Sequence, residues 1–169
     1  MIRKTTKEDI KEIMPIFEEA RKTIATLGID QWQNGYPSAE VVLADVKKDQ
    51  SYLCELDGRI VGTFAMLENG EPTYDKIYDG HWLTGDESRD YIALHRVAIS
   101  VSSRGSGLSG KIIAYAVDFA KALGRNSLRI DTHRGNVVMR RMLEKNGFVH
   151  CGTIFLESGD ERVAYEKII

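Results

Sequence analysis

The chain of 169 residues contains no apolar run approaching the ~20 residues that a membrane span requires. Its first nine residues, Met1–Asp9, are largely charged or polar and lack the apolar segment of a secretory signal peptide. The formal net charge is −2 at pH 7, so no strong excess of charge favours nucleic acid or an anionic membrane as a partner. We therefore expect a soluble, cytoplasmic protein that binds neither.

Cysteine and proline are also scarce, with two and three residues respectively. Cys54 and Cys151 form no paired motif, which favours two buried free thiols in a reducing compartment. Neither the cysteines nor His81, His133 and His150 stand at metal-ligand spacing. The sequence therefore predicts no metal site.

What is present is the composition of an ordinary globular domain, 43% hydrophobic and 28% charged, so we expect residues 1–169 to form a single domain. Apolar periodicity predicts strands at 1–5, 52–56, 60–67, 91–99, 127–132, 148–156 and 162–168, and helices following Thr6, following Ser38, at 109–123 and at 137–145. Asp57-Gly58 indicates a hairpin turn. Pro15 lies inside the first helix and is compatible with a kink or a break there. This order of elements predicts an α/β fold with a mixed sheet and helices on its faces.

The most informative segment is Val97–Lys111, in which an apolar strand enters a loop containing Gly105, Gly107 and Gly110 and then opens into a helix. Glycines let backbone N–H groups approach a ligand closely. A helix N-terminus adds unpaired donors and partial positive charge. The segment therefore predicts a site for a phosphorylated cofactor. An ordinary tight turn would need only one of the three glycines.

Three interpretations of this loop compete. Residues Gly105–Lys111 satisfy the P-loop pattern G-x-x-x-x-G-K, but that motif next needs a Ser or Thr for magnesium, and residue 112 is Ile. The glycine spacing of a dinucleotide fold is also met, although not in an N-terminal βαβ unit. The third interpretation accounts for more of the chain.

Arg104-x-x-Gly107-x-Ser109 after a strand resembles the Arg/Gln-x-x-Gly-x-Gly/Ala signature of the GNAT superfamily of N-acetyltransferases. Asn136, followed by residues Leu143–Phe148, is similar to the family's Asn…Tyr-Glu-Lys-x-Gly-Phe segment. The resemblance is good over roughly residues 91–152, and the order of elements fits over the full length. It implies the acyl-CoA acyltransferase fold, in which a central, mostly antiparallel sheet is flanked by helices, and acetyl-CoA as the cosubstrate.

In this family the diphosphate of coenzyme A sits on the glycine loop, and the preceding strand pairs with the pantetheine arm and polarises the thioester. The residues implied for cofactor binding are Val97, Ala98, Ile99, Arg104, Gly105, Ser106, Gly107, Leu108, Ser109, Gly110 and Asn136. Two of these have an equally good ordinary role. Arg104 suits a solvated surface position, and Asn136 suits the N-cap of the following helix.

A primary amine is mostly protonated at neutral pH, so attack on the thioester benefits from a general base. His95 is the first candidate, because imidazoles titrate near ~6.5 and strand alternation would place residues 95, 97 and 99 on one face. The arylalkylamine acetyltransferases of this superfamily carry a histidine at a similar place. A packed core histidine is an equal alternative. Glu68 is the second candidate, although a solvated loop carboxylate is its commoner role.

The chain departs from the family pattern at Leu143, where a tyrosine often serves as general acid for the leaving thiolate. Leucine cannot donate a proton, and the sequence does not rank Tyr91, Tyr115 and Tyr165 as substitutes. This departure makes a second function credible, a non-catalytic acyl-CoA-binding or sensing domain. The first remains transfer of an acetyl group from acetyl-CoA to a small amine or a peptide N-terminus.

The resemblance places the acceptor between the loop joining the first two helices and the irregular segment 68–90, a length of loop that is usually functional or mobile. Aromatic and acidic side chains in these regions could hold a cationic amine. They are Trp32, Tyr36, Glu68, Glu71, Tyr74, Asp75, Tyr78, Asp79 and Trp82. A solvated loop packed by its own aromatics is the alternative. A homodimer is compatible with the sequence, but no feature demonstrates an interface.

Overall fold

The structure is a computed structural model that describes all residues from 1 to 169. Seven strands form one mixed sheet in the order β1-β2-β3-β4-β5-β7-β6. The strands are β1 (Ile2–Lys4), β2 (Ser51–Leu56), β3 (Arg59–Leu67), β4 (Tyr91–Ile99), β5 (Ser127–Thr132), β6 (Val149–Phe155) and β7 (Glu161–Ile168). The helices are α1 (Ile10–Ala25), α2 (Ala39–Lys47), α3 (Leu108–Ala122) and α4 (Val137–Lys145), with short 3₁₀ turns η1 (Lys7–Asp9), η2 (Pro72–Tyr74) and η3 (Val101–Ser103). The predicted mixed, mostly antiparallel sheet with flanking helices is confirmed.

The chain divides into two compact units. Unit 1 comprises Met1–Met66 and His95–Ile112, and unit 2 comprises Leu67–Leu94 and Ile113–Ile169. This division does not test the expectation that residues 1–169 form a single domain, which stays a prediction.

In unit 1, the strands β1, β2 and β3 form an antiparallel ladder. The hairpin between β2 and β3 turns at Asp57 and Gly58, whose φ angles of 50° and 74° are both left-handed. Two consecutive left-handed residues are typical of a type I′ turn, which matches the twist of the flanking strands. The hairpin expected from the Asp-Gly pair is confirmed.

The N-terminal helices begin at the predicted capping residues. Thr6 forms a capping box with Asp9 at the start of η1, and α1 follows directly. The hydroxyl of Ser38 accepts a hydrogen bond from the backbone N–H of Val41 at 3.3 Å and so caps α2. The possible break at Pro15 is absent, because α1 continues through it as one helix of 16 residues. A proline removes one backbone hydrogen bond at that position, and packing of the apolar face of α1 offsets the loss.

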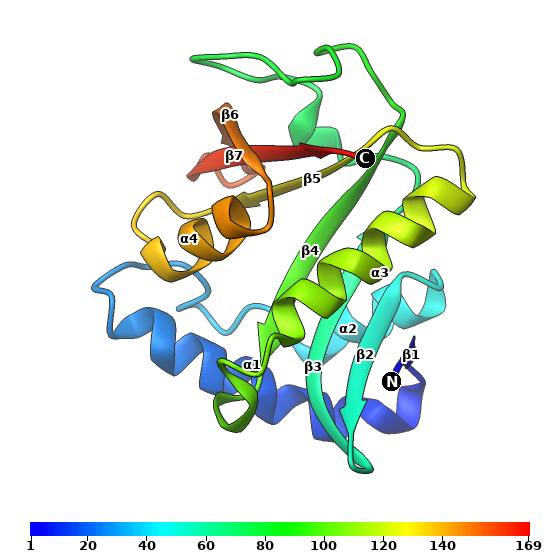
Figure 1. Ribbon diagram of the computed structural model, residues 1–169. Helices are drawn as coiled ribbons and strands as arrows, with labels where there is room; N and C mark the ends of the chain where they lie inside the picture. Colours follow the sequence, from blue (N-terminus) through cyan, green and yellow to red (C-terminus); the bar gives the residue numbers. More distant parts are fainter. The chain divides into compact units, whose positions relative to one another are not determined.

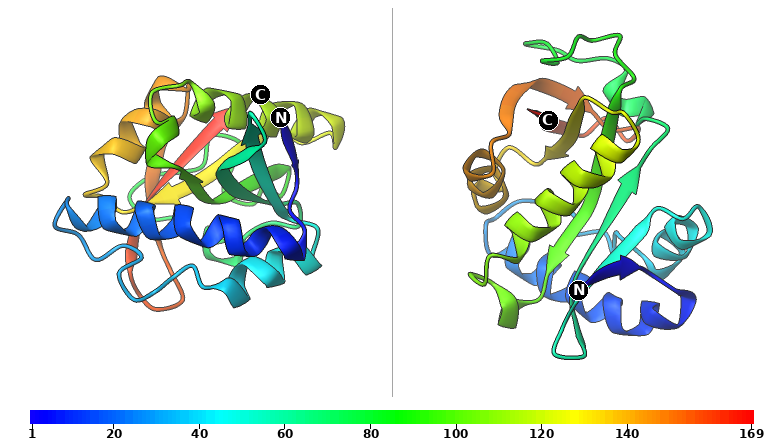
Figure 2. Two further views of the ribbon diagram at one scale, coloured as in Figure 1. Left: turned by 90° about the horizontal axis from the view of Figure 1, so that it is seen from below. Right: turned by 45° about the vertical axis from the view of Figure 1, so that its right-hand side comes forward.

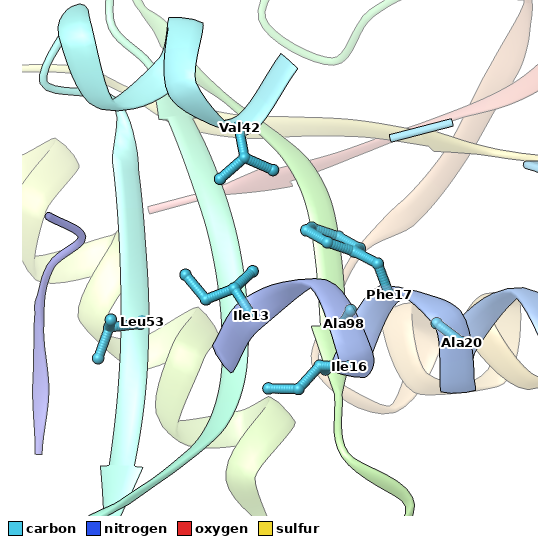
Figure 3. Packing of buried hydrophobic residues seen from close by; sticks show 7 residues of the cluster. All are labelled: Ile13, Ile16, Phe17, Ala20, Val42, Leu53 and Ala98. Atoms are coloured by element: carbon cyan, nitrogen blue, oxygen red, sulfur yellow. The ribbon is translucent and has the colours of Figure 1, made fainter. Parts of the chain in front are cut away.

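The core of unit 1 lies between these helices and the strands. Ile13, Ile16, Phe17 and Ala20 of α1 form one buried cluster with Val42 of α2, Leu53 of β2 and Ala98 of β4 (Figure 3). Both helices lie on the same side of the ladder (Figures 1 and 2). Full burial of each large aliphatic or aromatic side chain contributes about 1.5–3 kcal/mol, so this cluster fixes α1 and α2 against the strands.

In unit 2, the antiparallel strands β5, β7 and β6 lie side by side, with α4 against β6 (Figure 1). The first residues of β4 join this unit by parallel pairing of Tyr91 with Ser127 and of Ala93 with Arg129. The helix α4 ends at Lys145, and Gly147 follows with a left-handed φ of 84°. The predicted strand, helix and closing hairpin are confirmed within two residues at each end.

The irregular segment before β4 is part of the core of unit 2. Tyr74 and Trp82 are 0% and 3% exposed and cluster with Tyr91 and Ile154. The indole N–H of Trp82 donates to the carbonyl of Tyr74 at 3.0 Å, and the Tyr74 hydroxyl donates to Asp131 at 2.7 Å. The expectation that Tyr74 and Trp82 contact an acceptor amine is therefore wrong, because both rings are enclosed by the protein itself.

A buried ion pair fastens the same segment. Glu166 accepts hydrogen bonds from Arg129 Nε at 3.0 Å, from the Ser127 hydroxyl at 2.6 Å and from the Thr84 hydroxyl at 2.6 Å. The guanidinium carbon of Arg129 lies 4.3 Å from the ring centre of Trp82, where a cation–π attraction adds to the ion pair. This network ties residues 82–85 to β5 and β7.

Candidate functional site

The glycine loop lies in unit 1 between η3 and α3. Gly105 and Gly107 adopt left-handed φ angles of 78° and 79°, a conformation that L side chains rarely adopt. The carbonyl of Gly107 accepts from the backbone N–H of Lys111 at 3.2 Å, so the helical ladder starts there. The N–H groups of residues 108–110 precede that ladder and have no acceptor within the helix.

Space is available beside these donors. A Cβ atom placed on Gly105 or Gly107 would meet no heavy atom within 4 Å. N–H groups without an acceptor in the helix, the positive end of the α3 dipole and open space around two glycines together suit an anion such as a diphosphate. The cofactor-binding role of Gly105–Gly110 stays a prediction that this geometry supports.

The last turns of α1 hold this loop in place. The carboxylate of Glu19 accepts from the backbone N–H of Val101 at 2.8 Å, and the Thr23 hydroxyl accepts from Arg104 Nη2 at 2.9 Å. Glu19 and Thr23 are one helical turn apart on the same helix face. Arg104 is therefore engaged with α1, and its contact with a diphosphate stays a prediction.

Strand β4 contains an irregularity at Arg96, whose φ is 53° in the middle of otherwise extended backbone. The side chain of Arg96 donates twice to the carboxylate of Asp45 on α2, at 2.7 and 2.8 Å, and once to the Tyr36 hydroxyl at 2.9 Å. Burial by itself lowers the pKa of Arg96, but Tyr36 and Asp45 outweigh burial and hold the pKa above its usual value. The strand distortion is thus stabilised by a charged anchor.

Because of this distortion, the side chains along β4 do not alternate between the two faces as regularly as the sequence predicts. The left-handed backbone at Arg96 interrupts the pleat between His95 and Val97, so residues 95, 97 and 99 do not form one regular face. Ala98 packs against α1, whereas Val97 and Ile99 are half-buried. His95 is half-buried as well, and its role as general base stays a prediction.

In unit 2, the predicted residues around α4 have ordinary structural partners. Asn136 accepts from the backbone N–H of Met139 at 3.1 Å, which confirms it as the N-cap of α4. Leu143 is fully buried. The Tyr165 hydroxyl accepts from Arg140 at 2.9 Å and donates to Glu144 at 3.2 Å. The cofactor contact of Asn136 stays a prediction.

The other acid–base candidates of unit 2 are placed as follows. Tyr91 is fully buried, and its hydroxyl accepts from the backbone N–H of Glu71 at 3.0 Å. Glu68 is half-buried at the end of β3, and its carbonyl accepts from Arg125 at 3.2 Å. Its carboxylate stays the second candidate base. Tyr115 of α3 is half-buried.

No three histidine, cysteine, aspartate or glutamate side chains of the chain gather into a group that could hold a metal ion. His81 forms a surface pair with Asp86 at 2.7 Å, and both cysteines are buried free thiols, as expected. None of the four α-helices has the length and apolarity needed to cross a membrane.

Arg96, Asp45 and Glu19 were not predicted from the sequence as residues of this site. A signal existed for Arg96, since it is a charged residue in the middle of the apolar strand Tyr91–Ile99. Nothing in the sequence marked Asp45 or Glu19, because each acts on a residue more than 50 positions away.

Comparison with known proteins identifies the family. The profile described as the Acetyltransferase (GNAT) family matches residues 11–148, and the chain belongs to this family. The crystal structure of a GNAT-family acetyltransferase from Streptococcus agalactiae is similar over 100% of this chain and 95% of that one, with 36% identity and a TM-score of 0.90. The family resemblance inferred from the glycine loop and the α4 segment is confirmed.

Two further relatives are more distant. An uncharacterised N-acetyltransferase of Methanocaldococcus jannaschii is 24% identical over 136 residues, which is 76% of this chain; the chain spans about half, 51%, of that relative's length. The PaiA N-acetyltransferase of Thermoplasma acidophilum, solved in complex with coenzyme A, is 18% identical with a TM-score of 0.73 over 100% of this chain and 98% of that one. At that identity the likeness shows the fold alone.

Proposed function

We propose that this chain transfers the acetyl group of acetyl-CoA to a primary amine, either of a small molecule or of a peptide N-terminus. Membership of the GNAT family supports acetyl transfer in general. The observation that carries the proposal is the glycine loop, where Gly105 and Gly107 are left-handed with open space around them and the N–H groups of residues 108–110 precede the helical hydrogen bonds of α3. These features suit the diphosphate of coenzyme A.

Acetyl-CoA supplies the acetyl group and, as its thiolate, the leaving group. The chain's own contribution begins with binding. The loop donors hold the diphosphate, and Glu19 and Thr23 fix the loop from α1. Backbone N–H groups of Val97–Ile99 stabilise the negative charge that develops on the thioester oxygen, as oxyanion-hole donors do. The structure of the Thermoplasma acidophilum relative with coenzyme A supports this cosubstrate.

The reaction also requires a neutral amine. A primary amine with a pKa near ~10 reaches the site mostly as an ammonium ion, so a base must take one proton before attack. His95, next to the β4 distortion, is the first candidate for this base, and Glu68 is the second. The departing thiolate has a conjugate-acid pKa of about 8.5, so it leaves without assistance at a useful rate. Departure without an acid is necessary here because Leu143 stands where the family often has a tyrosine.

The test is release of free thiol from acetyl-CoA in the presence of single amines. Phenethylamine, putrescine, alaninamide and an alanine-initiated peptide represent cationic acceptors, and glutamate represents an anionic one. We expect turnover with at least one cationic amine and a preference for cationic over anionic acceptors. A preference for glutamate would contradict the proposed acceptor class.

The fully buried Leu143 favours one second candidate, a non-catalytic acyl-CoA-binding domain, because no acid stands at that position. Calorimetric titration with coenzyme A separates the two functions. Binding of coenzyme A without thiol release for any amine would support the second function and overturn the first. Absence of both binding and release would overturn both.

A further inference from the structure

Arg96 links the distorted point of β4 to two other parts of unit 1. Its guanidinium holds Asp45 of α2 with two hydrogen bonds and the Tyr36 hydroxyl with a third. The side chains of Arg96 and Asp45 are only 13% and 12% exposed. A bidentate pair of this kind fixes the plane of the guanidinium, so the N–H group that points to Tyr36 has a defined direction.

Tyr36 belongs to the loop that joins α1 to α2. Arg21 of α1 donates to the carbonyls of Tyr36 and Pro37 at 3.4 and 3.3 Å, and Gln33 donates to the carbonyl of Arg21 at 3.0 Å. The Trp32 ring lies edge-on to the Tyr36 ring, with centroids 6.3 Å apart. Side chains that donate to backbone carbonyls and the contact between the two rings hold the loop, and Arg96 holds the Tyr36 hydroxyl.

The Tyr36 hydroxyl accepts the hydrogen bond from Arg96, and its own hydrogen is left for a further acceptor. The tyrosine is half-buried, so part of its side chain is in contact with solvent. A hydroxyl that accepts from a cation is also a stronger donor, because hydrogen bonds in a chain polarise one another. The neighbours of Arg96 in the chain are His95 and Val97. His95 is the candidate base, and Val97 is the first residue of the segment proposed to polarise the thioester.

We propose that Arg96 is a positioning residue, which joins the β4 distortion to the loop between α1 and α2 and presents the Tyr36 hydroxyl as a hydrogen-bond donor to the acceptor molecule. The inference rests on the proposed acetyl transfer. It assigns Tyr36 to binding of an amine that carries a second polar atom, such as the carbonyl oxygen of an amide or a peptide. Asp45 acts through Arg96 and makes no contact with substrate.

The experiment compares Y36F, R96K and the double variant with wild type, using alaninamide and phenethylamine as acceptors. Phenethylamine has no second polar atom. We expect Y36F to lower kcat/KM for alaninamide roughly threefold to tenfold, the loss of one hydrogen bond, and to leave phenethylamine within twofold. R96K should act similarly, since lysine cannot hold Asp45 bidentately and Tyr36 together. The double variant should be no worse than the worse single one, because both act on one contact.

Q33A is the matched control, because Gln33 steadies the backbone of the same loop without touching the Tyr36 hydroxyl. We expect its selectivity between the two amines to equal that of wild type. Equal losses for both amines in Y36F, additive losses in the double variant, or the same selectivity change in Q33A would each overturn the proposal.

A second measurement does not depend on turnover. Amide hydrogen exchange followed by mass spectrometry should be faster in R96K than in wild type both over residues 30–38 and over residues 94–97, whereas Q33A should leave the exchange of residues 94–97 unchanged. Unchanged exchange in the loop of R96K would overturn the link between β4 and the loop. If wild type releases no thiol with any amine, the acetyl-transfer function and the assignment of Tyr36 fail, while the exchange measurement still decides the link.

Discussion

The Nε atom of Arg129 donates to a carboxylate oxygen of Glu166 at 3.0 Å, and neither side chain has any exposed surface. Arg129 is enclosed by the rings of Trp82 and Tyr91, with its guanidinium carbon 4.3 and 4.2 Å from their centres. An ion pair without access to water depends entirely on its partners within the protein, because losing one leaves an uncompensated charge. Loss of either partner is therefore expected to destabilise unit 2 strongly.

Replacing Glu166 with glutamine should lower the free energy of unfolding by about 3–5 kcal/mol, since Arg129 would stay buried without a counter-ion. The matched control is E161Q, because Glu161 and Arg134 form a pair at 2.6 Å that is about half exposed. Exposed pairs contribute less than about 1 kcal/mol. Urea unfolding at pH 7 measures both changes, and equal losses in the two variants would contradict the distinction.

The same pair predicts a pH dependence. Burial by itself raises the pKa of Glu166, but hydrogen bonds from Ser127, Thr84 and Arg129 outweigh it and hold the pKa below its usual value. A lowered carboxyl pKa gives stability that is present above the unfolded-state value near ~4.3 and is lost as the pH falls through the folded-state value. Below pH ~4 the wild-type advantage over E166Q should therefore shrink. A constant difference between pH 7 and pH 3 would refute this explanation.

Substitution of His95 by alanine should reduce kcat by between about 100-fold and 10,000-fold while leaving the KM for acetyl-CoA within about twofold, because a general base acts on the amine and not on cofactor binding. The acid limb of the pH–rate profile should disappear as well. H81A is the control, since His81 is exposed and pairs with Asp86 on the surface. A profile of unchanged shape in H95A would remove His95 from the mechanism and leave Glu68 as the base to test.

The proposed role of the glycine loop predicts that two glycine-to-alanine variants with a similar loss of stability differ in their affinity for coenzyme A. Gly107 and Gly124 have left-handed φ angles of 79° and 66°, and in both a Cβ atom would meet no neighbour within 4 Å. Each alanine should cost about 1–2 kcal/mol of stability. Only G107A should also weaken coenzyme A binding, by about tenfold or more, because its Cβ would occupy the open space and keep the diphosphate from the N–H groups of the loop. Calorimetric titration decides, and similar affinities in both variants would place the diphosphate elsewhere.

The two cysteines should be inert in the folded protein. Burial raises the pKa of Cys54 and of Cys151 to about 11, so very little reactive thiolate exists at pH 8. A thiol-specific colorimetric reagent should label neither residue quickly under native conditions and both after unfolding in guanidinium. Rapid native labelling would show that one of these sites opens easily.

Features that depend on a few neighbouring residues were predictable from the sequence. The left-handed turn at Asp57-Gly58 and the caps at Ser38 and Asn136 all follow from the chemistry of residues within one turn of each other. The mixed sheet followed from the order of strands and helices, and the family from two separate motifs. Such signals survive in a single sequence because the interacting groups are adjacent in it.

Tertiary contacts decided the rest. Aromatic residues of the segment 68–90 looked available for a ligand, yet Tyr74 and Trp82 are enclosed by strands that come much later in the chain. Arg104 turned toward Thr23 of α1, and Arg96 found Asp45 on α2. The residues next to these positions in the sequence do not determine such partners, because burial and long-range ion pairing depend on which surfaces the fold brings together. The sequence by itself determined the family and the glycine loop, whereas the anchoring of β4 and of the loop between α1 and α2 was decided only by the folded chain.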